Sequence, residues 1–256
     1  MNELYNKSAD DLYESELVGE PIEQISQRYP EFEIDDAYAI QQINTQRKIQ
    51  NGRKISGKKI GLTSDAMMKA VGVKEPDYGI LFSDMKVDSV VAKGSLIQPK
   101  VEGELAFILK SDLTGTITYE DVINATDYIV PAIEVCDSRI KDWKLKIVDT
   151  ISDNASCGAY ALGGIKIDPR KQDLKEIEMT LYQNGEFVNE GKGIDVAGDP
   201  VNAVVWLANR LQTYGVALNA GDVILSGSFT AFIRAYSGDE IVCDFKKFGK
   251  VTLNFE

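Results

Sequence analysis

Three glutamates stand in stretches of sequence that are otherwise apolar. Glu102 and Glu104 lie two residues apart in PKVEGELAFIL, residues 99–109, and Glu134 is the only charge in IVPAIEVC, residues 129–136. Residues two apart in an extended strand share one face, so Glu102 and Glu104 point to the same side. Buried carboxylates need cations, partners or protons, because an unpaired buried charge is too costly to keep. Three of them on two strands could surround one hard divalent cation, Mg²⁺ or Mn²⁺.

A simpler interpretation competes with the metal site. Glu-x-Glu is a common pattern, and it would also suit a solvated strand with an unrelated Glu134 that pairs with Arg or Lys. The apolar surroundings favour burial, because beyond Glu104 both faces of residues 99–109 are apolar. This pattern is typical of a strand buried on both sides. From these residues alone, both interpretations remain open.

The composition excludes several catalytic mechanisms and classes of partner. The chain of 256 residues contains no histidine and carries a net charge of −12. The absence of histidine excludes Ser-His-Asp and Cys-His catalysis and His-ligated zinc, so acid–base steps must use Lys, Asp, Glu, Tyr, Cys or metal-bound water. The negative charge argues against nucleic acid or an anionic membrane as the main partner. It does not exclude an anionic substrate, because a bound divalent cation reverses the local field.

Cysteine usage and the first residues predict a cytoplasmic protein. The three cysteines form no CxxC pair, which fits reduced thiols better than a disulfide framework. The opening MNELYNKSADDLYESEL is acidic and amphipathic, unlike a signal peptide. No apolar run approaches transmembrane length, so no membrane partner is expected.

The sequence divides into a helical part and a β-rich part. Apolar residues recur at helical spacing over residues 4–17 and 35–50, and Gly52 follows as a stop. From Lys54 the pattern changes to short β segments punctuated by glycine. Because no Pro/Gly/Ser-rich linker separates the parts, we expect residues 1–53 to form a helical region packed on a catalytic domain of residues 54–256.

Local signals predict further elements. Thr118–Asp121 resembles a capping box, and Asn184-Gly185 is a strong hairpin signal. Asp199-Pro200 predicts the start of a helix that ends at Gly215. A short helix is expected over residues 66–71. Many short strands, few helices and no regular βαβ alternation predict a β-rich α+β fold.

Several motifs, in order along nearly the whole chain, resemble one known family. They are GKKIGLTS (57–64), EPDYG (75–79), VEGELAFIL (101–109), PAIEVCDSRIKDW (131–143), DNASCG (153–158) and ILSGS (224–228). Together they resemble the 2-oxopent-4-enoate hydratases of the fumarylacetoacetate hydrolase superfamily, alongside the similar 4-oxalocrotonate decarboxylases. The resemblance implies a fumarylacetoacetate-hydrolase-like mixed β-sheet roll around a divalent metal, with an N-terminal helical lobe.

The resemblance also implies roles for individual residues. It assigns three ligands to Mg²⁺ or Mn²⁺, in agreement with the strand pattern: Glu102, Glu104 and Glu134. Lys59 matches the family's motif and is the candidate acid–base group, whereas Lys58 lies on the opposite strand face. Burial of Lys59 beside a cation would lower its pKa. Asp77 matches the acidic residue of a PDFG-like loop, where it would orient Lys59 or the water.

Other residues are candidates for substrate binding. Asn154 and Ser156 would hydrogen-bond substrate oxygens, although DNAS is also an ordinary turn or helix start. Arg139 would either pair with Asp137 or steer an anionic substrate. A further set would bind the substrate carboxylate through backbone N–H groups, because glycine allows close approach: Ser226, Gly227 and Ser228.

The resemblance leaves two activities open. A hydratase would add water to 2-hydroxypenta-2,4-dienoate (2-oxopent-4-enoate) and give 4-hydroxy-2-oxopentanoate in the meta-cleavage catabolism of aromatic compounds. A 4-oxalocrotonate decarboxylase would instead release CO₂ from 2-oxohex-3-enedioate. SRIKDWKLKI followed by DNASCG is closer to the hydratases, which we prefer. A non-catalytic scaffold subunit is a third interpretation. The family also implies a homo-oligomer, which in some members associates with a partner decarboxylase.

Overall fold

The computed structural model describes residues 2–64, 68–69 and 72–256. Apart from residues 68–69, the short helix expected over 66–71 lies outside this range. The helices are α1 (Asn2–Val18), α2 (Ile25–Arg28), α3 (Ile34–Gln50), α5 (Tyr119–Ala125), α6 (Ile147–Ser152) and α7 (Pro200–Gln212). The strands are β1 (Ile55–Gly61), β2 (Asp77–Phe82), β3 (Val90–Val91), β4 (Pro99–Leu109), β5 (Thr126–Asp137), β6 (Cys157–Leu162), β7 (Glu178–Gln183), β8 (Glu186–Lys192), β9 (Val223–Ser228), β10 (Ile233–Arg234), β11 (Glu240–Asp244) and β12 (Lys250–Phe255).

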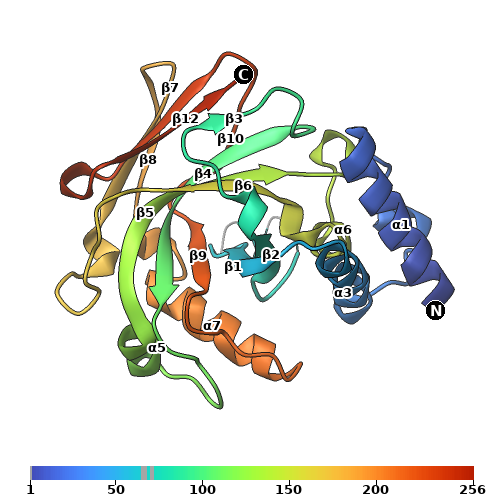
Figure 1. Ribbon diagram of the computed structural model, residues 1–256, viewed down its shortest axis with the longest axis horizontal. Coiled ribbons are helices and arrows are strands. Elements are labelled where there is room, and N and C mark those ends of the chain that lie inside the picture. The colour runs from blue at the N-terminus through green and yellow to red at the C-terminus, as the bar shows by residue number, and fades with distance from the viewer. Residues whose placement is uncertain (1, 65–67, 70–71) are drawn as a thin grey trace.

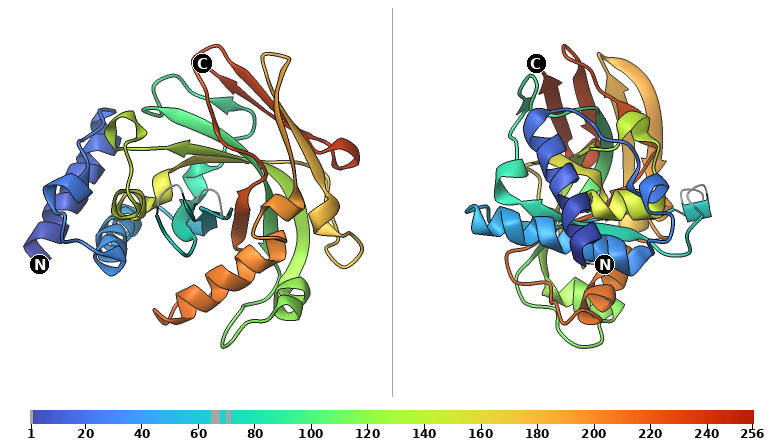
Figure 2. Two further views of the ribbon diagram at one scale, coloured as in Figure 1. Left: turned by 180° about the vertical axis from the view of Figure 1, so that it is seen from behind. Right: turned by 90° about the vertical axis from the view of Figure 1, so that its right-hand side faces the viewer.

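The strands form two mixed sheets. The first has the order β2-β1-β9-β4-β5-β6, with β10 paired to β4, and the second has the order β3-β12-β11-β7-β8. Most neighbours are antiparallel, but β1 runs parallel to β9 and β12 runs parallel to β3. The long strands β4 and β5 bend strongly, so the sheet curls into a half-barrel (Figure 1, Figure 2). The α+β prediction and the predicted family fold are confirmed.

The two faces of β4 have different surroundings: one packs against the second sheet, and the other carries Glu102 and Glu104. Gly103 faces the second sheet, where a Cβ atom in its place would lie 2.6 Å from Met179 Cε and 3.0 Å from Cys243 Sγ. The missing side chain therefore lets the two sheets approach closely. Because side chains alternate along a strand, Glu102 and Glu104 point away from this intersheet core.

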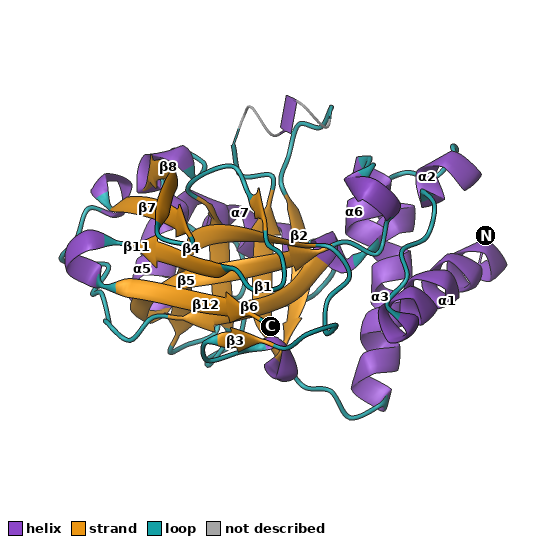
Figure 3. Ribbon diagram, turned by 90° about the horizontal axis from the view of Figure 1, so that it is seen from above, coloured by secondary structure: helices purple, strands orange, loops and turns teal. Residues whose placement is uncertain are grey.

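The helical region predicted for residues 1–53 gathers at one end of the molecule together with α6, which comes from much later in the chain (Figure 3). α3 packs against both α1 and α6. Asp149 of α6 accepts hydrogen bonds from the backbone and the hydroxyl of Ser26, at 2.9 and 2.6 Å. Gln41 of α3 donates to the carbonyl of Tyr78 in β2 at 2.9 Å. These contacts tie the helices to the β-rich part of the chain.

Three local predictions are confirmed. Thr118 and Asp121 form a reciprocal capping box at the start of α5. Asn184 and Gly185 join β7 to β8 with φ angles of 55° and 80°, as a tight two-residue hairpin requires. Asp199 accepts a backbone N–H at the start of α7, which packs against β9 and β1. In the described part of the chain, no helix combines the length and the apolar character needed to span a membrane.

Candidate metal centre and catalytic pocket

The β4–β5 ladder places two of the predicted ligands directly opposite each other. Glu102 pairs with Glu134 in this register, and Glu104 lies two residues farther along the same face of β4. The exposed fractions of Glu102, Glu104 and Glu134 are 9%, 0% and 1%. The structure therefore brings the three predicted carboxylates to one buried place.

The protein leaves much of this negative charge without partners. Glu104 Oε2 accepts the backbone N–H of Gly227 at 2.8 Å. Glu104 Oε1 and Glu134 Oε2 are buried and have no hydrogen-bond partner within the described residues, whereas Glu134 Oε1 forms an ion pair with Lys59. Burial, followed by the charge of Glu134, raises the pKa of Glu102 to about 8 and that of Glu104 well above its usual range. Orphaned buried acceptors of this kind fit a bound cation.

Cys136 is a nearby residue that the sequence did not single out. It offers a sulfur atom that, with one oxygen each from Glu102 and Glu134, forms a set of possible ligand atoms within 4.8 Å of one another. Burial and the neighbouring Glu134 raise the pKa of the Cys136 thiol well above its usual range. A neutral thiol is a poor ligand for a hard cation, whereas carboxylate oxygens suit one.

Lys59 enters the site from β1. Its Nζ lies 3.1 Å from Glu134 Oε1 as an ion pair and 3.8 Å from Cys136 Sγ. Lys58 is also buried but instead pairs with Asp222, at 3.2 Å. The two lysines thus have separate partners, as expected for opposite faces of one strand.

The protein's own groups shift the Lys59 pKa upward, and the lowering expected beside a bound cation stays a prediction. Burial favours the neutral amine, but the acidic neighbours Cys136 and Glu134 outweigh it and raise the pKa of Lys59 well above its usual value. The lysine is therefore held as an ammonium ion beside the carboxylates.

Asp77 lies beside Lys59 because Gly61 has no side chain. Gly61 and Asp77 pair across β1 and β2, and a Cβ atom on Gly61 would collide with Asp77 Oδ1 and lie 3.7 Å from Lys59 Nζ. Thr150 donates its hydroxyl to Asp77 Oδ2 at 3.2 Å. Burial raises the pKa of Asp77 despite the nearby Lys59. Gly61 was visible in the GKKIGLTS motif, whereas no local signal pointed to Thr150.

Lys59, Asp77, Glu102 and Cys136 line one pocket with a volume of about 200 Å³, whereas Glu104 and Glu134 are not among its lining residues. Its lining residues are Lys59, Gly61, Leu62, Asp77, Lys100, Glu102, Cys136, Trp143, Leu145, Thr150, Ala155, Ser156 and Phe232. A second cavity of about 330 Å³ also contacts Gly61, Leu62 and Glu102. Glu102 thus borders both spaces. Lys100 could have been found from the sequence, because strand alternation places it on the same face as Glu102.

Ser156 reaches this pocket, but Asn154 has a different role. The side-chain amide of Asn154 accepts from Ile80 N at 2.7 Å and donates to Ile80 O at 2.9 Å. The Ser156 hydroxyl donates to Asp153 Oδ2 at 3.0 Å. Residues 154–156 all have left-handed φ angles of 57°, 49° and 53°. Such angles cost about 1–3 kcal/mol each in non-glycine residues, so these hydrogen bonds hold a strained segment beside the pocket.

The segment from Ser226 to Ser228 does not form the expected free backbone cradle. The Gly227 N–H is already donated to Glu104, and its φ of 106° is one that glycine readily adopts. The Ser228 hydroxyl donates to the carbonyl of Thr230 at 2.6 Å. The Ser226 hydroxyl is buried and has no hydrogen-bond partner in the described structure. Gly227 therefore positions a carboxylate of the protein, which corrects the prediction that its N–H binds substrate.

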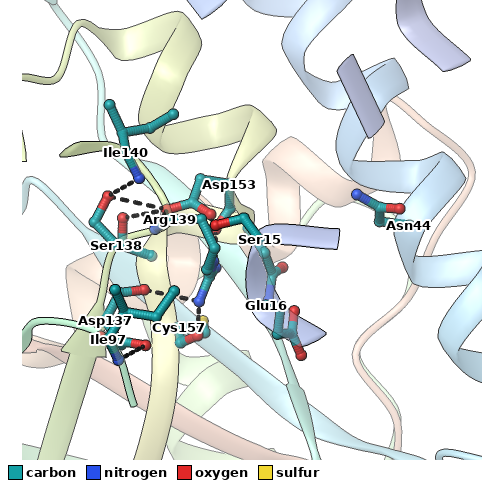
Figure 4. Close-up of polar contacts among 12 residues, drawn as sticks. Ser15, Glu16, Asn44, Ile97, Asp137, Ser138, Arg139, Ile140, Asp153 and Cys157 are labelled. Atoms are coloured by element: carbon teal, nitrogen blue, oxygen red, sulfur yellow. Dashed lines mark hydrogen bonds and ion pairs between the residues drawn. The ribbon is translucent and has the colours of Figure 1, made fainter. Parts of the chain in front are cut away.

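Arg139 is not among the residues that line this pocket. Figure 4 shows it among its own polar contacts, which include Asp137, Asp153 and Cys157. Its buried guanidinium forms an ion pair with Asp153 and donates to the carbonyls of Asp137 and Cys157 at 2.7 and 2.9 Å. The Asp137 carboxylate instead accepts the backbone N–H of Ile97 at 2.9 Å. Arg139 thus contacts Asp137 through the backbone carbonyl and not through an ion pair, and it links Asp137, Asp153 and Cys157.

Comparisons with known proteins identify the family of the chain. The family described as fumarylacetoacetate (FAA) hydrolase C-terminal matches residues 68–255. A 2-keto-4-pentenoate hydratase of Paraburkholderia xenovorans is 45% identical, over 98% of this chain and 94% of the relative. A 2-hydroxyhexa-2,4-dienoate hydratase of Comamonas testosteroni is 39% identical, over 95% of this chain and 94% of the relative.

Among solved structures, a 4-oxalocrotonate decarboxylase from Pseudomonas putida G7, complexed with magnesium and adipate, superimposes with a TM-score of 0.96. It is 35% identical, and the match covers 100% of this chain and 98% of that chain. The similarity in sequence and in structure thus extends over almost the full length. The chain belongs to the 2-keto-4-pentenoate hydratase and 4-oxalocrotonate decarboxylase family of the fumarylacetoacetate hydrolase superfamily.

Proposed function

We infer that the protein is a hydratase that adds water to 2-hydroxypenta-2,4-dienoate, the enol form of 2-keto-4-pentenoate, in the meta-cleavage catabolism of aromatic compounds. The observation that carries this inference is the 45% identity to a 2-keto-4-pentenoate hydratase over 98% of the chain. The pocket supports it, because Glu102, Asp77 and two lysines line one space. Protonation at C5 followed by addition of water across C3 and C4 gives 4-hydroxy-2-oxopentanoate.

We propose that Glu102, Glu104 and Glu134 hold one Mg²⁺ or Mn²⁺ ion. The unpartnered oxygens of Glu104 and Glu134 support this ligand set, and carboxylates suit both metals. When bound, the cation would stabilise negative charge that develops on the 2-oxygen of the substrate. The related decarboxylase was solved in complex with magnesium, which supports the proposal of a divalent ion here.

In this proposal Lys59 is the acid–base group that delivers protons to the carbon skeleton of the substrate and removes them. Its ammonium group is held in place by Glu134 at 3.1 Å, so it can deliver a proton from Nζ to C5. Asp77 is fixed by Thr150 and has a raised pKa, so it can orient Lys59 or the attacking water and hold a proton in turn. The apolar side chains of Trp143 and Leu145 would pack against the diene.

A direct assay tests the hydratase proposal. Freshly generated 2-hydroxypenta-2,4-dienoate is mixed with the protein and Mg²⁺ or Mn²⁺, and the loss of dienoate absorbance is followed with and without a chelator. We expect rapid loss that the chelator abolishes. No loss with either metal would contradict the proposal and would favour the non-catalytic scaffold.

The second candidate is a 4-oxalocrotonate decarboxylase, favoured by the TM-score of 0.96 to such an enzyme. The same preparation is given 2-oxohex-3-enedioate, and the CO₂ released is measured. We expect little CO₂ and efficient hydration of the five-carbon substrate. Rapid CO₂ release without hydration would reverse this ranking.

Two expectations about the cellular context accompany the proposal. We propose that the protein acts in the cytoplasm, where its free, buried cysteines would remain reduced. We also propose that it assembles as a homo-oligomer and, as in some family members, can associate with a decarboxylase. Light scattering of the purified protein, alone and mixed with a decarboxylase, would test the assembly.

A further inference from the structure

Lys100 occupies an unusual position at the edge of the catalytic pocket. It lies on the same face of β4 as Glu102, two residues away. Its Nζ is 4.2 Å from the ring centroid of Trp143 and 4.0 Å from that of Phe232. The two ring centroids are 5.4 Å apart, and the Trp143 indole is fixed by donating to Gln98 O at 2.9 Å. The ammonium group is thus held between two aromatic rings.

Lys100 forms no ion pair and no side-chain hydrogen bond with any residue that the structure describes. The buried lysines Lys58 and Lys59, in contrast, each have a carboxylate partner. Contacts with the aromatic rings keep the Lys100 ammonium in place without neutralising its charge. An ammonium group that is already held in position can bind an anion with little reorganisation.

The neighbouring strand provides a second observation that points to an anion. Arg234 of β10 is the direct partner of Lys100 in the ladder, and its guanidinium has no carboxylate partner among the described residues. Like charges placed directly opposite on adjacent strands destabilise a sheet. An anion bound near Lys100 would relieve this repulsion. Arg234 is exposed, with its guanidinium 5.5 Å from the Tyr236 ring centroid, so the two cations concentrate positive charge at this edge of the sheet.

We propose that Lys100 binds a carboxylate of the substrate between Trp143 and Phe232. This inference rests on the proposed function, because it concerns the pocket assigned to the dienoate. The carboxylate has two possible sources: C1, which every 2-oxo acid of this class carries, or a second carboxylate at the far end of a dienedioate. Both would form the same charge-assisted hydrogen bond with Nζ.

Binding is measured without turnover to separate this inference from the hydratase proposal. Pentanoate and adipate, which have one and two carboxylates, are titrated into the Mg²⁺-loaded protein by calorimetry. Lys100→Met keeps most of the apolar stem and removes the charge. We expect weaker binding by about 10–100-fold, the usual value of a charge-assisted hydrogen bond. Lys100→Arg should recover part of the affinity.

Lys166→Met is the matched control. Its Nζ lies 3.7 Å from the ring centroid of Tyr128, so the change also removes a lysine from an aromatic ring, but away from this pocket. Carboxylate binding should not change in this variant. Thermal unfolding of each variant verifies that it is folded, and Lys100→Gln replaces Lys100→Met if the latter fails to fold.

The outcomes separate the two sources of the carboxylate. Weaker binding of both probes assigns Lys100 to the C1 carboxylate, and weaker binding of adipate alone assigns it to the distal one. Unchanged binding of both probes in folded Lys100→Met and Lys100→Gln would overturn the inference, even if the wild type hydrates the dienoate. Lys100-dependent binding without hydration would leave the inference standing and refute the hydratase proposal.

Discussion

The buried carboxylates of the candidate metal centre have more acceptor oxygens than the protein's own donors and cations contact. Lys59 contacts Glu134, and one backbone N–H contacts Glu104, yet several buried carboxylate oxygens remain without hydrogen bonds in the described structure. Keeping such groups ionised requires a cation. The carboxylates should therefore control metal affinity, whereas Lys59 and Asp77 should control the rate of the proton steps.

Removing one carboxylate charge should remove the metal. Glu102→Gln, Glu104→Gln and Glu134→Gln should each weaken Mn²⁺ binding and abolish turnover, because each deletes one anionic ligand of a shared ion. Calorimetric titration with Mn²⁺ measures the affinity. Unchanged affinity in all three variants would rule out a shared site.

Lys59→Met should separate binding from catalysis. The variant keeps much of the apolar stem, so Mn²⁺ should still bind. Turnover should fall by about 10²–10⁴-fold, the usual contribution of a positioned acid–base group. Steady-state kinetics at saturating metal measures the loss. A wild-type rate would assign the proton steps to another group.

Lys58→Met is the control on the opposite strand face. It deletes the partner of the buried Asp222, so thermal unfolding should show lower stability, while the folded fraction keeps its turnover. A loss of turnover in folded Lys58→Met that matches Lys59→Met would mean that the effect is not specific to the pocket face.

Gly61→Ala tests the placement of Asp77. The added methyl group would collide with Asp77 Oδ1, so the carboxylate must move away from Lys59. Turnover should fall while Mn²⁺ affinity stays near wild type, because the carboxylates proposed to bind the metal are on other strands. Parallel kinetics and calorimetry measure this difference. Full activity would show that Asp77 is not needed in this position.

At the level of elements, strand alternation predicted which side chains share a face, but not how the strands pair. The shared face of Glu102 and Glu104 follows from the period of two within β4. The register that sets Glu102 opposite Glu134, and the irregular pairing near Gly227, depend on contacts distant in sequence. The backbone bonds of Asn154 are equally non-local. Sequence reasoning therefore predicted which carboxylates lie close together, but it did not predict the internal hydrogen bonds of Asn154 and Gly227.

Docking of α1 should depend on pH through Glu16. This carboxylate pairs with Lys48 of α3 and with Arg53, at 3.1 Å for Arg53 Nη1. Burial alone would raise its pKa, but Lys48, Arg139 and Arg53 outweigh burial and lower the pKa of Glu16 to about 2. Because the folded-state pKa lies below the unfolded value, the stabilisation is present above about pH 4.5 and lost as the pH falls through about 2.

Glu16→Gln should therefore lower the free energy of unfolding at pH 7 by about 1–2 kcal/mol, after allowing for partial solvent exposure. The difference from wild type should shrink between about pH 4.5 and 2. Urea unfolding across this range measures it, with Glu14→Gln as the control, because Glu14 is an exposed acid of the same helix. An equal loss in both variants would contradict the assigned role of Glu16.

At the scale of the whole molecule, the N-terminal helices pack against the β-rich part of the chain. We propose that residues 1–53 are a region packed on the 54–256 core and not an independent domain. Composition and periodicity were sufficient to predict a helical part, a β-rich part and an α+β fold. They did not indicate that α6 joins the N-terminal helices, because this packing connects parts of the chain more than a hundred residues apart. The pocket lies where these parts meet, with Thr150 of α6 contacting Asp77 of β2.

The most direct test of the central claim is the product formed from 2-hydroxypenta-2,4-dienoate in deuterated water with Mg²⁺, identified by NMR. We predict 4-hydroxy-2-oxopentanoate carrying solvent deuterium at C5 and C3, since one proton is delivered at C5 before water adds and another at C3 afterwards. Recovery of 2-oxopentenoate isomers alone, without the 4-hydroxy product, would contradict the claim that this protein is a hydratase.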